Sequence, residues 1–261
     1  MYTNRDEINA LFDLKGQVAV VTGGGSGIAQ AIAMGYAAMD AKVAILDMSQ
    51  ENMDKTAALF EENGHCVVTK HCDIADAGRV KQVFSEVVAE LGPVDISVNS
   101  AGITLAKPSI ETTAEEFSRI IETNVTGTFN CCKAAAESMI PRKKGKIINI
   151  GSIRGSIGVE WGMAAYCSSK GGVHMLTRQL AVEWAKYGIC VNCLVPNLTI
   201  TPISKYIQQN KPRYEFYLSR IPMGHPGYPE DFVSAAIFLA GAGSNYVSGQ
   251  LLYIDGAAFV G

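Results

Sequence analysis

Residues 17–28 read Gln-Val-Ala-Val-Val-Thr-Gly-Gly-Gly-Ser-Gly-Ile, and the architecture can be worked out from this segment. The β-branched run predicts a buried strand, and the small residues from about Gly27 to Met39 predict a helix. Glycines between the two allow a tight turn and leave the helix N-terminus open to an anion. A second strand is predicted at Lys42–Asp47, which completes a β–α–β order.

The same alternation continues outward from this segment to the C-terminus. Further strands are predicted at residues 65–70, 94–99, 146–151, 189–195 and 251–254. Helices are predicted at residues 51–63, 78–91, 114–140, 164–187 and 229–240. Continuous apolar strands separated by helices indicate an α/β protein with a parallel sheet covered on both faces. Right-handed crossovers then give a doubly wound Rossmann fold with seven parallel strands.

Nothing in the sequence divides residues 1–261, because no linker, repeat or low-complexity tract is present. We therefore expect a single domain. The one long irregular region is predicted at residues 197–227, and a loop of that length in a compact domain usually has a function. We expect a lid over the substrate, with a plain surface insertion as the alternative.

The composition argues against several classes of protein. The 22 Lys and Arg residues against 25 Asp and Glu give a net charge of −3, so we expect no nucleic-acid partner. No apolar stretch approaches the roughly 18 residues of a membrane span, and we expect no membrane insertion. Seven cysteines without a signal peptide indicate reduced thiols and a cytoplasmic protein.

Metal or redox chemistry is not expected from the Cys and His residues. Cys190 and Cys193 have CxxC spacing, but residues three apart on a strand point to opposite faces. The four histidines share no spacing typical of metal ligands.

Asp47, at the end of the second predicted strand, bears on which dinucleotide the glycine turn would hold. A carboxylate there accepts hydrogen bonds from ribose hydroxyls and repels a 2′-phosphate, so NAD is favoured over NADP. Neither Ser26 nor Met48 supplies the cation that such a phosphate needs. In the alternative interpretation Asp47 only caps the next helix, but Ser49 is better placed to do so.

Tyr166 and Lys170 stand four residues apart at the start of a predicted helix. Their side chains therefore lie on one face, with Cβ atoms about 5–6 Å apart. A neighbouring ammonium lowers the pKa of a phenol, and acid–base work near neutral pH needs a lowering of about three units, or ~4 kcal/mol. Alone, this pair occurs by chance in many helices.

Five motifs in order change that assessment: Thr22-Gly23-x-x-x-Gly27, Asn99-Ser-Ala-Gly102, Asn124, Ser152 and Tyr166-x-x-x-Lys170. With them the chain resembles the short-chain dehydrogenase/reductase family. Within that family it is most similar to the sugar, polyol and gluconate 5-dehydrogenase members. The resemblance implies an NAD(H)-dependent oxidoreductase that interconverts a secondary alcohol and a ketone on a polyol, sugar or sugar acid. Acyl-carrier-protein reductases, hydroxysteroid dehydrogenases and a non-enzymatic NAD-sensing scaffold are the alternatives.

The resemblance also implies a role for each motif residue. Tyr166 would exchange a proton with the substrate oxygen, while Lys170 would lower its pKa and hold the nicotinamide ribose. Ser152 would hydrogen-bond the reacting carbonyl, and Asn124 would hold a water that links Lys170 to solvent. The expected substrate-binding residues are Ser152, Arg154, Trp161 and Tyr166. The expected cofactor-binding residues are Gly23, Gly25, Ser26, Gly27, Ile28, Asp47, Asp73, Ile74, Asn99, Ala101, Gly102, Tyr166, Lys170, Pro196, Thr199 and Thr201.

Three further expectations depend on this resemblance. Ser152 lies 14 residues before Tyr166, one more than is common in the family, so Ser156 stays as the alternative serine. Cations and phenols of the lid suit a polyhydroxylated or acidic ligand, unless they are merely solvated. A homotetramer is expected, with the helices at 114–140 and 164–187 between subunits; a charged fraction of 18% agrees with this.

Overall fold

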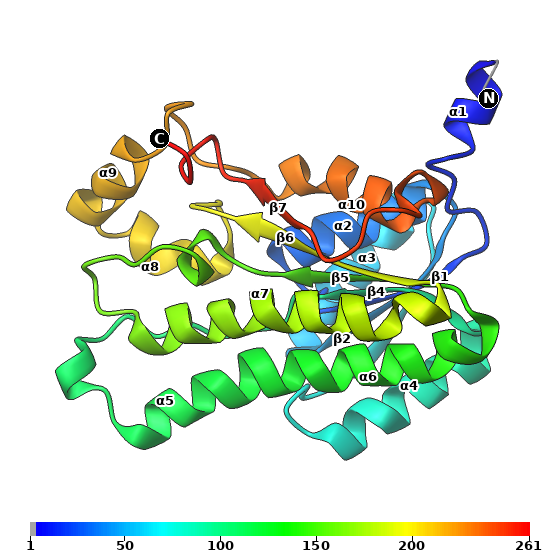
Figure 1. Ribbon diagram of the computed structural model, residues 1–261, viewed down its shortest axis with the longest axis horizontal. Helices are drawn as coiled ribbons and strands as arrows, with labels where there is room; N and C mark the ends of the chain where they lie inside the picture. Colours follow the sequence, from blue (N-terminus) through cyan, green and yellow to red (C-terminus); the bar gives the residue numbers. More distant parts are fainter. Residues whose placement is uncertain (1–3) are drawn as a thin grey trace.

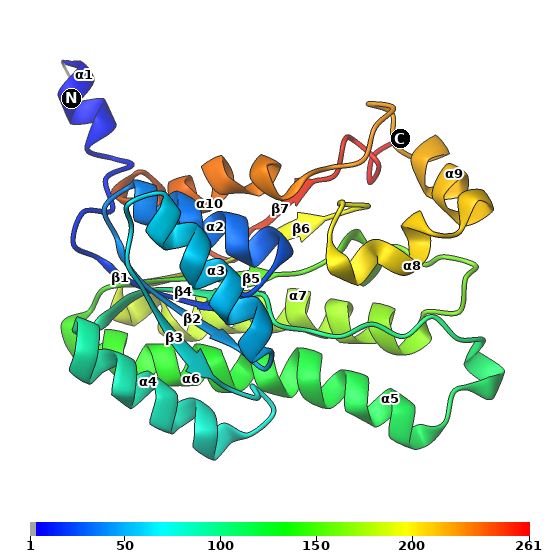
Figure 2. The ribbon, with the colours of Figure 1, turned by 180° about the vertical axis from the view of Figure 1, so that it is seen from behind.

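The computed structural model describes residues 4–261, in which seven strands form one parallel sheet between two layers of helices (Figures 1 and 2). The strand order is β3-β2-β1-β4-β5-β6-β7, and every pairing is parallel. The predicted seven-stranded doubly wound sheet is confirmed. The strands are β1 (Val18–Thr22), β2 (Lys42–Asp47), β3 (Val67–His71), β4 (Val94–Asn99), β5 (Gly145–Ile150), β6 (Ile189–Pro196) and β7 (Leu251–Ile254).

Alternate residues of each strand serve the two helical layers, as β1 illustrates. Ala19 and Val21 pack with Ile32 in one core, whereas Val18 and Val20 pack in the other. The first core lies under α2 (Gly27–Ala38), α3 (Gln50–Glu62) and α10 (Val233–Ala240). The second lies under α4 (Ala77–Leu91), α6 (Gly127–Met139) and α7 (Ala164–Trp184), of which α6 and α7 lie side by side at the front of Figure 1.

The helix predicted over residues 114–140 is present as one run, but its hydrogen-bonding pattern changes within it. The structure has α5 (Ala114–Ile121), then a π-helical turn (Glu122–Thr126), then α6, and Figure 1 shows α5 and α6 running end to end. A π turn inserts extra backbone and is often found at functional sites. This turn contains Asn124, whose side chain is almost fully buried.

Residues 197–227, predicted as irregular, contain a 3₁₀ turn (Pro202–Ser204), α8 (Lys205–Gln208) and α9 (Lys211–Ser219). The sequence did not predict these short helices because the segment is rich in proline, although proline is well tolerated in a first helical turn. A parallel bridge between Thr199 and Gly227 brings the two ends of the segment together. The two ends of the lid segment, as we call residues 197–227, therefore lie side by side.

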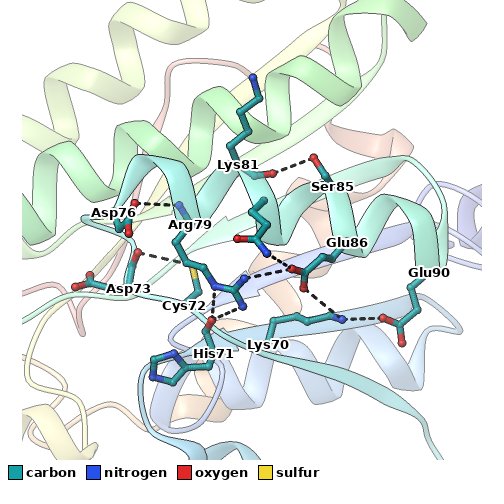
Figure 3. Close-up of polar contacts among 11 residues, drawn as sticks. Lys70, His71, Cys72, Asp73, Asp76, Arg79, Lys81, Ser85, Glu86 and Glu90 are labelled. Atoms are coloured by element: carbon teal, nitrogen blue, oxygen red, sulfur yellow. Dashed lines mark hydrogen bonds and ion pairs between the residues drawn. The ribbon is translucent and has the colours of Figure 1, made fainter.

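The connection from β3 to α4 is braced by charged side chains (Figure 3). Arg79 donates to the backbone carbonyl of His71 through Nε (3.1 Å) and Nη2 (3.0 Å), and pairs with Glu86 at 3.2 Å. Lys70 lies 3.6 Å from Glu86 and 3.1 Å from Glu90. These partly exposed pairs add little stability, but they fix the turn between β3 and α4.

No helix in the described part of the chain is long and apolar enough to span a membrane. The remaining α-helix, α1 (Arg5–Asn9), precedes the sheet and buries none of its residues.

Candidate active site

Two cavities open where the strands end, on either side of Tyr166. The larger, of about 340 Å³, is called the cleft; the smaller, of about 100 Å³, is called the inner cavity. Five residues line both and form a shared wall: Ile28, Tyr166, Pro196, Thr201 and Ile203. The cleft lies at the point where the strand order reverses, between β1 and β4, which is where ligands bind in open α/β sheets.

The glycine turn shapes the floor of the cleft. Gly23 has a φ of +70°, and an added Cβ would come within 3.0 Å of the backbone of Ala101, so no other residue fits there. Ser26 is the N-cap of α2, yet its side chain makes no capping hydrogen bond. Backbone N–H groups of the first turn are therefore free to meet an anion such as a pyrophosphate.

Asp47 lies at the edge of the cleft and also supports the turn. Its Oδ2 accepts a hydrogen bond from the Gly25 N–H at 3.1 Å, and its Oδ1 accepts one from the Ser49 N–H at 2.9 Å. The cap of α3 is Ser49, whose Oγ accepts from the Asn52 N–H at 3.2 Å. The alternative that Asp47 itself caps α3 is therefore excluded.

Thirteen of the sixteen expected cofactor-binding residues line the cleft. They are Gly23, Ser26, Gly27, Ile28, Asp47, Asp73, Ile74, Ala101, Gly102, Tyr166, Lys170, Pro196 and Thr201. Sequence reasoning missed Met48, Asn52, Ser100, Ile103 and Thr123, which line it too.

The other three expected residues lie elsewhere. Gly25 does not line the cleft, and its backbone N–H donates a hydrogen bond to Asp47. The side chain of Asn99 is buried and donates to Asn149 Oδ1 at 2.9 Å, which directs it into the core. Thr199 lines the inner cavity instead of the cleft.

Tyr166 and Lys170 project from the first turns of α7 toward the ends of β5 and β6. Lys170 Nζ donates to the Ile150 carbonyl at 2.8 Å and lies 5.9 Å from the centre of the Tyr166 ring. Burial lowers the pKa of Lys170 to about 8, because the ammonium loses its hydration. The lysine and the phenol therefore share one buried face, as their spacing predicts.

The expected lowering of the Tyr166 pKa is not found in the protein itself. Burial raises the pKa of Tyr166 to about 12, and the hydrogen bond from Ser152, which favours the phenolate, only partly offsets it. The lowering was expected from Lys170 together with the positive nicotinamide ring, so it stays a prediction for the protein with its cofactor bound.

Asn124 is held too tightly to act as a freely exchanging group. Its Oδ1 accepts from the Ile103 N–H at 2.8 Å, and its Nδ2 donates to the Ile103 carbonyl and to Ser169 Oγ, each at 2.9 Å. Its side chain thus fixes the loop after β4 to α7. The Asn124 carbonyl accepts from Thr128 Oγ1 at 2.7 Å, and the water that Asn124 is expected to hold remains a prediction.

Ser152, not Ser156, is the serine that shares a cavity with Tyr166. Ser152 Oγ accepts from the Arg154 N–H at 3.1 Å, and its own O–H donates to the Tyr166 phenol. Ser156 Oγ is engaged elsewhere, 3.3 Å from His174 Nδ1 and 2.7 Å from the Tyr253 hydroxyl.

The inner cavity combines aliphatic walls with a few polar groups. Arg154 lines the inner cavity as expected. Trp161 does not line it and packs edge-on against Phe216. Sequence reasoning missed Thr104, because only the fold shows that the loop after β4 turns into this space. The remaining lining residues include Ile153, Met163, Leu198, Tyr206, Ile207 and Tyr217.

The described residues 4–261 contain no group of three His, Cys, Asp or Glu side chains suited to a metal ion. Their seven cysteines are all free thiols.

Comparison with known proteins agrees with this geometry. A family model described as enoyl-(acyl carrier protein) reductase matches residues 23–257. Galactitol 2-dehydrogenase (L-tagatose-forming) of Cereibacter sphaeroides is 36% identical over 96% of this chain and 98% of its own. 3β-Hydroxysteroid dehydrogenase 1 of Eggerthella lenta is 37% identical, covering 94% of each chain.

The fold has equally similar solved relatives. The crystal structure of a gluconate 5-dehydrogenase from Burkholderia cenocepacia, in complex with NADP and tartrate, superposes with a TM-score of 0.91. It is 33% identical, and the match covers 97% of this chain and 98% of that one. The chain belongs to the short-chain dehydrogenase/reductase family and is a nicotinamide-dependent oxidoreductase that acts on CH–OH groups.

Proposed function

We propose that this protein is an NAD(H)-dependent dehydrogenase that interconverts a secondary alcohol and a ketone on a polyol, sugar or sugar acid. The observation that carries the proposal is the shared wall, in which Tyr166 faces both the cleft and the inner cavity. A substrate carbon in the inner cavity can therefore meet a dinucleotide in the cleft at the phenol. Relatives that act on galactitol and on gluconate support the substrate class.

The catalytic roles follow from the hydrogen bonds of the site. During alcohol oxidation Tyr166 would take the hydroxyl proton, and Ser152, which hydrogen-bonds the Tyr166 phenol, would turn its O–H to the substrate oxygen. The residues of the cleft would hold the nicotinamide, which would supply the hydride acceptor and a positive charge beside the phenol. Lys170 adds a second positive charge, and together these charges offset the burial that raises the pKa of Tyr166. Asn124 positions the loop and α7 around this group.

NAD is the proposed cofactor because of the charges along the cleft. Asp47 lines it, and Lys170, at the catalytic end, is the one Lys or Arg side chain among the described residues that does so. A 2′-phosphate near Asp47 would meet a carboxylate and no balancing cation. Some solved relatives contain NADP. The proposed preference for NAD therefore rests on Asp47 of this chain and not on its relatives.

The test is NADH formation, followed at 340 nm, with polyols, aldonates, hydroxyacyl esters and steroids as substrates and NADP in parallel. We expect turnover of a polyol or sugar acid with NAD. Turnover of esters or steroids alone would refute the substrate class. A requirement for NADP would refute the role given to Asp47.

The family context supports two further proposals about the protein as a whole. We propose a homotetramer located in the cytoplasm. The apolar side chains exposed on α6 and α7, which include Phe129, Met175 and Val182, suit burial between subunits. The reduced state of all seven cysteines suits a reducing compartment.

A further inference from the structure

The inner cavity has an unbalanced positive charge. Of the side chains that line it within residues 4–261, only Arg154 is fully charged at neutral pH, and none is a carboxylate. Arg154 is only partly buried and also lines a neighbouring cavity that contains Glu160, so its charge does not require a partner. A guanidinium in the wall of a cavity nevertheless offers an anionic ligand a strong, charge-assisted hydrogen-bond partner.

Most of the Arg154 hydrogen-bond donors are unused. Nη1 donates to the Gly158 carbonyl at 3.0 Å, and the guanidinium lies 5.1 Å from the centre of the Tyr217 ring. Arg154 forms no salt bridge within the described chain. A guanidinium has five N–H donors in a rigid fork that matches a carboxylate, so four donors remain for a ligand.

The charge of Arg154 acts on the groups around the cavity. It lowers the pKa of Tyr206, Tyr217 and Cys167, although burial raises each of them overall. The positive charge therefore acts on the space between the lid segment and α7.

The cations of the lid segment, Lys205, Lys211, Arg213 and Arg220, do not line the inner cavity and do not compete for this role. Arg213 lies 4.8 Å from the Trp161 ring centre and 5.6 Å from that of Tyr206, outside the cavity lining. Lys211 is exposed and lies 3.8 Å from Glu215. Arg220 lies 5.3 Å from the centre of the Phe216 ring and lines a neighbouring cavity instead of the inner cavity.

We propose that Arg154 binds a carboxylate of the substrate, which makes the substrate a sugar acid instead of a neutral polyol. This inference rests on the proposed function and narrows it. Arg154 stands two residues after Ser152, and its backbone N–H bonds the Ser152 hydroxyl. The carboxylate anchor and the group that binds the reacting oxygen are thus held at a fixed separation, which selects the carbon to be oxidised.

The test compares gluconate with sorbitol, which share a carbon chain and differ in the terminal carboxylate. The wild-type protein should prefer gluconate, and Arg154→Gln should lower kcat/KM for gluconate by about 100-fold, because it leaves the carboxylate unpaired. The value for sorbitol should fall far less, because sorbitol has no carboxylate to leave unpaired. Arg154→Lys should recover part of the loss, since a lysine restores charge but not the planar fork.

Arg220→Gln is the matched control, because it removes a nearby arginine that does not line the inner cavity and should change neither value. Equal losses for both substrates in Arg154→Gln would overturn the proposal, as would a wild-type preference for sorbitol.

If neither substrate is oxidised, the proposed function fails, but the anchor is still tested by binding. Tartrate, a small dicarboxylate, should bind the NADH-loaded wild-type protein in calorimetry and bind Arg154→Gln at least tenfold more weakly. Equal binding of tartrate by the two proteins would refute the anchor independently of turnover.

Discussion

Tyr166 and Asp47 show how far a single residue can be interpreted without a fold. The order of motifs was enough to single out Tyr166, and the structure gives it the expected neighbours, Ser152 and Lys170. The sign of its pKa shift could not be predicted, because desolvation depends on which side chains surround it in three dimensions. Asp47 has a second task, the hydrogen bond to Gly25, that spacing alone does not reveal.

Replacing Tyr166 with Phe removes the proton-transferring hydroxyl and keeps the ring. We expect kcat to fall by about 10²–10⁴-fold, because positioned acid–base catalysis contributes that much. NADH binding, measured by fluorescence titration, should persist. Tyr246→Phe is the control, since that fully exposed ring lies away from both cavities. Undiminished turnover in Tyr166→Phe would refute the mechanism.

Asp47→Asn tests the cofactor preference. The change removes the charge and gives up one of two backbone hydrogen bonds. The ratio of kcat/KM for NADP to that for NAD should rise by about tenfold or more, since repulsion between close like charges near a surface is worth about 1–4 kcal/mol. Asp54→Asn, an exposed change on α3, should leave the ratio unaltered. An unaltered ratio in Asp47→Asn would show that the carboxylate does not select the cofactor.

At the scale of elements, α7 and its contacts were harder to predict than the strands. The five central strands, β1, β2, β4, β5 and β6, follow from apolar runs, because a strand buried on both faces has a composition of its own. The π turn at Asn124 was missed because an extra residue in a helix leaves the apolar pattern nearly unchanged. His174 was also missed; its ring lies so near Gly151 and Gly155 that an added Cβ there would approach it to 2.5 and 2.7 Å.

His174 makes the free energy of unfolding depend on pH in the acid range. Its side chain is almost fully buried, and burial, helped by Lys170 and Arg178, lowers its pKa from 6.5 to about 4. Below pH 6.5 the unfolded chain binds a proton that the folded chain excludes. The free energy of unfolding should therefore fall by about 3 kcal/mol as pH drops from 6.5 to 4, and then level off.

His174→Asn keeps a polar group for Ser156 and removes the titration. The loss of stability between pH 6.5 and 4, measured by urea unfolding, should be smaller by that amount in the variant. His71→Asn alters an exposed histidine and should follow the wild-type curve. Equal slopes in wild type and His174→Asn would contradict the assignment.

For the whole molecule, the sheet order places the cleft, and the helical faces predict the assembly. The parallel order was predictable from the β–α alternation, and Ser152, Arg154 and Tyr166 were expected at the substrate site; the contribution of the loop after β4 was not, because it comes from a distant part of the sequence. The low charge content of 18% pointed to subunit contacts, and the apolar residues exposed on α7 show where they would form.

Light scattering should give four chains per particle. Val182→Glu places a charge on the exposed face of α7, where 77% of the residue is accessible, and should yield smaller particles. Ile110→Glu changes a residue that is 96% exposed, far along the chain from α7, and should leave the mass unaltered. A monomeric wild-type protein would overturn the predicted tetramer.

The shared wall also has a consequence for steady-state kinetics. Thr201 and Ile203, at the start of the lid segment, separate the two cavities, so the nucleotide completes one side of the chamber that receives the alcohol. Binding should therefore follow a compulsory order, with NAD first and NADH last. Product-inhibition patterns test this: NADH should compete with NAD and act noncompetitively toward the alcohol. The residues that the two cavities share would thus decide which ligand binds first and which product leaves last in each turnover.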